Sequence, residues 1–200
     1  VNSLDPATGK VFWSYPWDVR FGLTVATPRL AGDLLLFSSF YTSSKCFKLD
    51  ATQPAATLQW EGKSFSEKNT DTLHSLMSTP FVENGHIYGV CSYGQLRCLK
   101  LDTGERLWET FAATTGGPPV RWANAFIIKH ENRFFLANEQ GDLIIAKLTP
   151  QGYEELSRAK ILKPTTTDPK RAVVWSHPAF ANQCVFMRND EEIVCASLAK

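Results

Sequence analysis

Hydrophobic and polar residues between Leu76 and Trp108 alternate in short runs that are separated by turn signals. Four runs of about five residues each are rich in β-branched, aromatic or alternating apolar residues: 78–82, 86–91, 96–101 and 106–110. The segments between these runs contain Gly85, Gly94 and Gly104, which favour tight reversals of the chain. The pattern therefore predicts a four-stranded antiparallel meander.

The same pattern recurs along the whole chain. Leucines near the end of the third strand of each unit mark the repeat: Leu4, Leu49, Leu101, Leu148 and Leu198. Successive markers are 45, 52, 47 and 50 residues apart. A four-stranded repeat of nearly fifty residues is typical of a β-propeller blade. We therefore predict an all-β fold, a β-propeller of four-stranded antiparallel blades, with about four blades visible.

The repeat assigns residues 1–200 to one propeller domain. The predicted parts are a blade tail over 1–17 and blades over approximately 24–61, 76–111, 122–162 and 174–200. A polar connection over 163–171 precedes the last blade, for which the pattern predicts three strands, at 174–180, 184–187 and 192–198. The segment 153–162 has a helix-forming composition, but its position in the repeat predicts a strand.

Composition and charge are ordinary for a globular protein. Apolar residues make up 44% of the chain and charged residues 20%. A net charge of +1 gives no electrostatic reason to expect nucleic acid or an anionic membrane as a partner. No apolar run approaches the roughly 20 residues of a membrane span. The chain starts at Val1 inside a turn-and-strand pattern, which we interpret as a processed or excised segment, so a missing targeting sequence carries no weight.

The sequence contains five cysteines: Cys46, Cys91, Cys98, Cys184 and Cys195. A two-residue turn at 94–95 would place Cys91 opposite Cys98, and the same reasoning for the last hairpin places Cys184 opposite Cys195. Both pairs then fall on hydrogen-bonded sites with Cα atoms about 5.5 Å apart, which suit a disulfide poorly. We expect buried apolar packing, with disulfides as the alternative. No cysteine has another Cys or a His nearby at the spacing of zinc ligands, so metal binding is not expected.

Asp, Gly and Trp residues recur around the turns that follow the marker leucines: Asp5, Gly9, Trp13, Trp60, Asp102, Gly104 and Trp108. In two copies the step from Gly to Trp is four residues. This arrangement resembles the tryptophan-docking motif of pyrroloquinoline quinone (PQQ)-like propellers. In that motif the glycine permits a positive φ in the turn, and the indole packs against the next blade. The turn after Leu49 lacks the Thr-Gly pair, and the one after Leu148 lacks Asp and Trp.

The resemblance covers essentially the whole chain. Segments 17–38, 94–101 and 177–198 look like the C-terminal half of bacterial PQQ-binding-like repeat proteins of the BamB-like outer-membrane assembly family. Complete members have seven or eight blades, so the resemblance implies further blades upstream and a periplasmic or exported location. Alternatively, the strand at 11–17 completes the unfinished last blade and closes a four-bladed ring.

Several residues suited to ligand binding occur at corresponding blade entrances: His74, Arg121, Trp122, Trp175 and His177. Because the opening strands of a propeller line its central channel, we expect these side chains to face one channel mouth, where a protein partner or a small ligand would bind. Ordinary loop and blade-interface roles are the alternative, as is carbohydrate binding through the two tryptophans. His86 and His130 fall in or beside hairpin turns and are expected to be solvated.

Catalytic quinoproteins of this kind hold PQQ with two adjacent cysteines, a Trp floor and acidic calcium ligands. This chain has no adjacent cysteines, and its only acidic cluster, 190–192, falls in a predicted hairpin turn. We therefore expect a non-catalytic scaffold or binding platform, with no catalytic or metal-binding residue and no cofactor. The alternative is a PQQ-dependent dehydrogenase that oxidises alcohols or sugars, with PQQ and calcium in the full-length ring.

Overall fold

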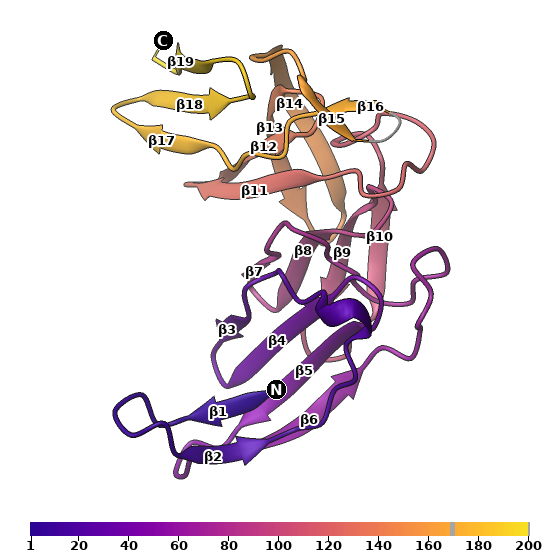
Figure 1. Cartoon of the computed structure of the whole chain (residues 1–200), viewed down its shortest axis with the longest axis vertical. Helices are drawn as coiled ribbons and strands as arrows, with labels where there is room; N and C mark the ends of the chain where they lie inside the picture. The colour runs from indigo at the N-terminus through magenta and orange to yellow at the C-terminus, as the bar shows by residue number, and fades with distance from the viewer. Residues whose placement is uncertain (169–170, 200) are drawn as a thin grey trace.

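The computed structural model describes residues 1–168 and 171–199. Within these residues the regular structure is β, apart from a 3₁₀ turn (η1, Arg20–Gly22). Small antiparallel sheets follow one another in a curved row from the N-terminal hairpin to the C-terminal sheet (Figure 1). The predicted all-β propeller of four-stranded antiparallel blades is confirmed.

Each blade is a meander of strands that are consecutive in sequence. Blade I contains β3 (Arg29–Ala31), β4 (Leu34–Ser39), β5 (Ser43–Leu49) and β6 (Ala56–Glu61). Blade II contains β7 (Phe81–Glu83), β8 (His86–Val90), β9 (Leu96–Lys100) and β10 (Arg106–Thr110). Blade III contains β11 (Ala125–His130), β12 (Arg133–Asn138), β13 (Asp142–Thr149) and β14 (Gly152–Lys160).

Smaller sheets flank these blades. The hairpin of β1 (Asn2–Leu4) and β2 (Val11–Ser14) precedes blade I. Blade IV has three strands, β17 (Ala179–Ala181), β18 (Cys184–Arg188) and β19 (Ile193–Ser197). β1–β2 and blade IV lie at opposite ends of the row, so β2 does not pair with blade IV within this chain (Figure 1).

The structure decides the predictions for two segments, 153–162 and 163–171. The segment 153–162 lies largely in β14, so the prediction of a strand over the helix-forming composition is confirmed. The predicted polar connection 163–171 instead contributes to a hairpin of β15 (Thr166–Asp168) and β16 (Arg171–Val173). Its threonines have a high strand propensity, which the repeat argument disregarded.

In three blades the first strand begins directly after a proline. The prolines are Pro28, Pro80 and Pro178, and the strands begin at Arg29, Phe81 and Ala179. Proline has no backbone N–H and cannot donate to the ladder, so it delays pairing. The predicted opening strands 78–82 and 174–180 are therefore wrong at their starts. Blade III has no proline at this place, and its first strand, β11, is longer than the other three.

The blades pack face to face through apolar clusters. Ile87 and Leu99 of blade II belong to the cluster shared with blade I, together with Leu36. Their strand neighbours Tyr88 and Cys98 belong to the cluster shared with blade III. Because successive side chains of a strand point to opposite faces, one sheet serves two neighbours at once.

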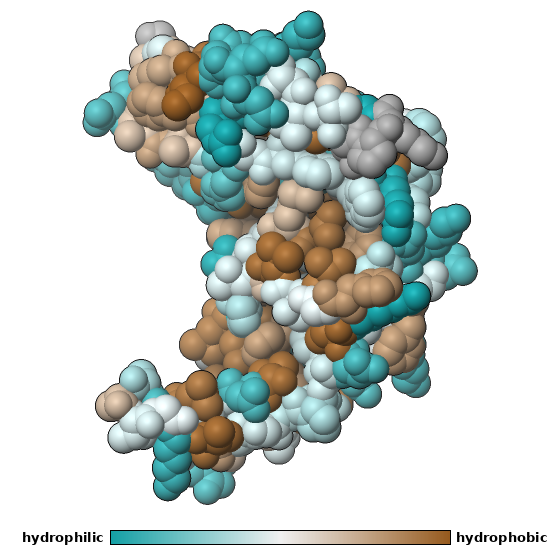
Figure 2. Space-filling view, viewed as in Figure 1, coloured by the Kyte–Doolittle hydropathy of each residue, from teal (hydrophilic) through white to brown (hydrophobic). Residues whose placement is uncertain are grey.

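The meander places two sets of turns at opposite ends of the blades. We call the end with the turns between first and second strands (31–34, 83–86, 130–133 and 181–184) the hairpin face. The other end carries the loops between blades (15–28, 62–80, 111–124 and 161–178) and the turns between second and third strands, and we call it the connection face. The concave side of the arc forms a hollow (Figure 2).

The cysteine pairings expected from two-residue turns are wrong. In blade II the register pairs Cys98 with Tyr88, because the turn spans 91–95 and Cys91 donates its N–H to the carbonyl of Gln95. In blade IV, Cys184 pairs with Ser197, and Cys195 pairs with Phe186. All five cysteines are free, and Cys46, Cys91 and Cys98 are buried as expected for apolar packing.

Candidate functional site

Trp60 of β6 makes a contact between blades I and II. Its indole Nε1 donates a hydrogen bond of 2.7 Å to the carbonyl of Leu101. The indole also lies against Gly104, where an added Cβ would come within 2.8 Å of the Trp60 ring. Gly104 has φ +73° and Gly9 has φ +72°, the left-handed conformation expected of the glycines in this motif.

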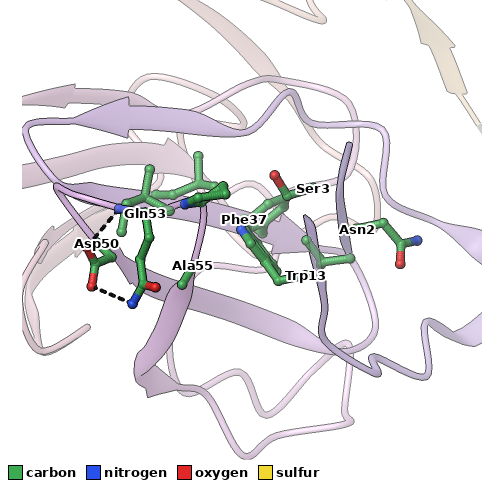
Figure 3. A pocket seen from close by; sticks show the side chains of 11 residues that line it. Asn2, Ser3, Trp13, Phe37, Asp50, Gln53 and Ala55 are labelled. Carbon is green, nitrogen blue, oxygen red and sulfur yellow. Dashed lines mark hydrogen bonds between the residues drawn. The ribbon is translucent and has the colours of Figure 1, made fainter. Parts of the chain in front are cut away.

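Trp108 and Trp13 occupy the same strand position at the neighbouring junctions. Trp108 Nε1 donates to the carbonyl of Thr149 at 2.8 Å, although the turn in blade III lacks the motif residues. Trp13 instead stacks obliquely on Phe47, with ring centroids 5.8 Å apart. Trp13 borders a cavity of about 260 Å³ between the β1–β2 hairpin and the Asp50 turn (Figure 3).

The other two residues of the motif, Asp5 and Asp102, lie in exposed turns on the outer strands. Asp5 accepts hydrogen bonds from the backbone N–H groups of Ala7 and Thr8, at 2.8 and 3.2 Å, and these lower its pKa. Asp102 contributes its carbonyl, which accepts from Gln59 of blade I at 3.4 Å. The aspartates therefore shape turns in this structure.

Arg121 lies on the connection face in an ion pair that bridges two inter-blade loops. Its guanidinium donates to Glu67 Oε2 from Nη2 at 2.7 Å and from Nε at 3.2 Å. It also donates to the hydroxyl of Tyr41 at 3.3 Å, and its Cζ lies 4.5 Å from the centroid of the Trp122 ring. Tyr93 donates its hydroxyl proton to Glu67 Oε1 at 3.0 Å. We call these five residues the Arg121 cluster.

The electrostatics of the Arg121 cluster keep the carboxylate of Glu67 ionised. Partial burial alone would raise the pKa of Glu67, but hydrogen bonds from Arg121 and Tyr93 outweigh burial and hold this pKa below its usual value. Burial and the bond to Glu67 raise the pKa of Tyr93. The hydrogen bond to Glu67 raises the pKa of Arg121, so the pair stays charged near neutral pH.

Two aromatic side chains stand exposed in the loops of the connection face. Phe21 is 72% exposed, and its ring lies 5.3 Å from that of Tyr41. Arg20 lies over both rings, with Cζ 5.0 Å from the Phe21 centroid and 5.4 Å from the Tyr41 centroid. Phe65, in the loop 62–80, is 71% exposed. The connection face thus presents arginine and aromatic groups together.

A second arginine–carboxylate–aromatic cluster lies at the next junction. Glu139 is buried and accepts from Arg171 through both carboxylate oxygens, each at 3.0 Å. Trp175 donates its indole N–H to the same carboxylate at 3.0 Å. The backbone N–H of Val174 donates to the Glu139 carbonyl at 2.7 Å. This arrangement ties the loop 161–178 to blade III and leaves the Trp175 side chain only partly exposed.

His74 does not line an open mouth, because its side chain is fully buried. Its Nδ1 lies 3.0 Å from the carbonyl of Phe40, and its Nε2 lies 3.3 Å from Asp71 Oδ1. His74 therefore orders the loop 62–80 in this structure. The expectation that it faces a channel mouth overlooked how many hydroxyl and carbonyl groups the serine- and threonine-rich blade I supplies around it.

The remaining predicted histidines are dispersed. His177 is exposed, with Nδ1 2.7 Å from the carbonyl of Pro178 and its ring 4.8 Å from that of Phe126. His130 is exposed and His86 half-buried, both at the hairpin face. Among the described residues, no hydrogen bond, ion pair or ring contact joins Trp175 or His177 to the Arg121 cluster.

Sequence reasoning found Arg121, Trp122 and Trp175 but missed the groups that organise them. The missed residues are Phe21, Tyr41, Glu67, Tyr93, Glu139 and Arg171. One signal in the sequence could have indicated the carboxylates. Arg121 and Arg171 both occur in connections that lead into a blade. A cation that becomes partly buried there requires a carboxylate partner.

The sheets, their order and the indole contacts between blades define the class: a β-propeller repeat protein of the PQQ-like type. The whole chain, residues 1–200, matches the family described as outer membrane protein assembly factor BamB, and the chain belongs to this family. No curated protein matches the sequence significantly.

Solved structures resemble this chain at low sequence identity, and the first two below share its fold. BamB from Moraxella catarrhalis is 16% identical with a TM-score of 0.60, over 97% of this chain and 50% of that one. The computationally designed Ika8 protein is 10% identical with a TM-score of 0.59, over 98% of this chain and 52% of that one. A europium-containing methanol dehydrogenase is 17% identical with a TM-score of 0.45, over 68% of this chain and 24% of that one. The chain thus spans about half the length of the first two.

PQQ with calcium is the cofactor that the fold family implies. No group of three or more His, Cys, Asp or Glu side chains within residues 1–168 and 171–199 is placed to hold a metal ion. Glu67 and Glu139 are already paired with arginines, so neither carboxylate is a free ligand in this structure. We therefore derive no reaction step through this cofactor. Within the same residues, no helix has the length and hydropathy of a membrane span.

Proposed function

We propose that this chain is a non-catalytic propeller platform that binds a protein partner on its connection face. The observation that carries the proposal is the exposure of Phe21 and Phe65 on the face that also presents Arg20 and the Arg121 cluster. Aromatic residues and arginine are enriched among the residues that dominate binding energy in protein interfaces. Here both kinds of side chain share one face.

The backbone supports this proposal, because two aromatic residues on the connection face adopt a conformation that bulky side chains rarely take. Phe21 has φ 59° and Trp122 has φ 67°. Such strain concentrates at functional sites, where the surrounding structure holds it in place. Trp122 is held by the hydrogen bond from its N–H to the carbonyl of Ser92 at 2.9 Å. A preorganised surface loses less conformational entropy on binding.

Family membership bears on the location and the cellular role of this protein. The family description names an outer membrane protein assembly factor, and a solved relative with the same fold carries the name BamB. Membership in this family supports the proposal of a periplasmic or exported location and of a part in the assembly of outer-membrane proteins. Arg121 and Trp122 are the predicted binding residues that remain in the proposed interface.

Site-specific photo-crosslinking tests this assignment. A photoreactive phenylalanine analogue placed at Phe21 or Phe65 in the full-length protein, in the cells that produce it, should give a discrete adduct with the same protein. The matched control is Leu58, which is also exposed but lies on the outermost strand of blade I. Equal adducts at all three positions, or none at Phe21 and Phe65, would count against the connection face. Substitution Arg20→Ala should reduce the Phe21 adduct severalfold while circular dichroism stays unchanged.

Enzyme activity of the full-length protein would contradict the proposal of a non-catalytic platform. The full-length protein can be incubated with PQQ and calcium and assayed for dye-linked oxidation of alcohols and sugars. We expect no turnover above that of PQQ and calcium alone. Substrate-dependent turnover would replace the platform by a quinoprotein dehydrogenase.

A further inference from the structure

A cavity of about 720 Å³ lies on the hairpin face, between blades III and IV. Apolar side chains from both blades line it: Phe135, Ile145, Phe180 and Leu198. The turn residues of both hairpins line it as well, including His130 and Arg133 of blade III and Asn182 of blade IV. A volume of this size is within the range of about 300–1,000 Å³ that small-molecule sites occupy.

The guanidinium of Arg133 is the unusual feature of this cavity. Its Nε is buried and has no hydrogen-bond partner among the described residues. The described lining contains no Asp or Glu. A charged group that lines a cavity without an anionic partner is costly, which favours a bound anion beside this guanidinium.

At the junction between blades II and III, a cation on the hairpin face has a carboxylate partner. Lys129, the other cation that lines the cavity, reaches back to Glu83 of blade II, with Nζ 2.6 Å from Oε2. Glu83 is the last residue of β7 and pairs with His86 across the hairpin. On the side of blade IV, the described residues that line the cavity offer Arg133 no carboxylate.

We propose that this cavity binds a small amphiphilic carboxylate, with its carboxylate on Arg133 and its hydrocarbon part against Phe135, Phe180 and Leu198. A guanidinium presents parallel N–H donors that match the two oxygens of a carboxylate. The single charge of a carboxylate also suits a lining with one unpaired guanidinium. The site lies at the opposite end of the blades from the connection face, so it stands apart from the proposed protein interface.

Titration calorimetry with sodium octanoate and 1-octanol tests the site on the full chain. The two compounds have the same hydrocarbon length and differ in charge. We expect octanoate to bind saturably and at least about tenfold more tightly than octanol. Equal affinity for the two compounds, or no saturable octanoate binding at millimolar concentration, would overturn the proposal.

Two substitutions locate the carboxylate. Arg133→Gln should weaken octanoate binding about tenfold, whereas Arg188→Gln, at an exposed arginine of blade IV outside the lining, should leave it unchanged. Unchanged octanoate affinity in Arg133→Gln would show that Arg133 does not hold the ligand.

Discussion

Trp60 donates its indole N–H to the backbone carbonyl of Leu101 in the neighbouring blade, at 2.7 Å. The two residues lie on different sheets that share no strand ladder. At the next junction Trp108 makes the same contact with Thr149, at 2.8 Å. A side chain of one outer strand thus completes the hydrogen bonding of a turn in the next sheet, in addition to the apolar packing that joins the blades.

The hydrogen bond of Trp60 should be measurable in stability. Trp60→Phe keeps an aromatic ring but leaves the Leu101 carbonyl without this donor, so we expect a loss of about 1–3 kcal/mol in the free energy of unfolding. Urea denaturation followed by circular dichroism measures it. Trp13→Phe is the matched control, because the Trp13 indole borders a cavity, and its loss should be below about 1 kcal/mol. Equal losses would mean that ring size, and not the hydrogen bond, stabilises the junction.

Gly104→Ala should be more destabilising than Gly9→Ala. The two glycines have nearly the same φ, +73° and +72°, so an alanine is strained to a similar extent at both, by about 1–2 kcal/mol. At Gly104 the new Cβ would also lie 2.8 Å from the Trp60 ring, whereas at Gly9 it meets no atom within 4 Å. We expect the difference in unfolding free energy to be at least about 1 kcal/mol. A Gly9 variant that is equally destabilised would contradict the docking contact.

Acid should destabilise the loop 62–80 through Asp71. Burial alone would raise the pKa of Asp71, but hydrogen bonds from His74, Ser43 and backbone N–H groups outweigh it and hold this pKa far below its usual value. Because the folded-state pKa is below the unfolded value of about 3.9, the contribution of Asp71 is present above about pH 4 and is lost as the pH falls.

Unfolding free energy measured from pH 7 to pH 3 should therefore decline at the acid end, and Asp71→Asn should flatten this decline. Asp33→Asn is the control, since Asp33 makes only an exposed ion pair with Lys48 at 3.6 Å. An acid profile that is the same for Asp71→Asn and wild type would contradict the prediction.

The five cysteines should differ widely in reactivity. Burial raises the pKa of Cys46 to about 12 and that of Cys98 to about 11, so both thiols are protonated and inaccessible at pH 8. Cys195 is exposed and should react with a maleimide first. Mass spectrometry after brief labelling should find Cys195 modified in the folded protein, and Cys46 and Cys98 only after unfolding. Early labelling of Cys46 would show that blades I and II separate readily.

Spacing along the chain predicts much of this fold. The recurring leucines and tryptophans indicate sheets of similar design, because each position in the repeat meets the same environment. The repeat even predicts β14 over a composition that favours helix. Local chemistry that differs between copies was harder to predict. Each proline shortens a first strand, and a five-residue turn at 91–95 shifts the register that a two-residue turn would give.

The candidate site was predictable only in part, because its contacts join residues far apart in the chain. Arg121 and Glu67 are 54 residues apart, and Arg121 and Tyr41 are 80 apart. No periodicity connects them, since each lies in a loop whose length varies between blades. Burial of His74 likewise depends on how the loop 62–80 folds over blade I.

The alternation of side chains in blade II limits where this protein can tolerate insertions and deletions. Inserting one amino acid within β8 would reverse the parity of the strand and send the residues now facing blade I towards blade III. Both junctions would fail together, although neither neighbour had been altered. Loops between the blades have no such constraint, so insertions and deletions should accumulate there while strands tolerate only changes that preserve parity.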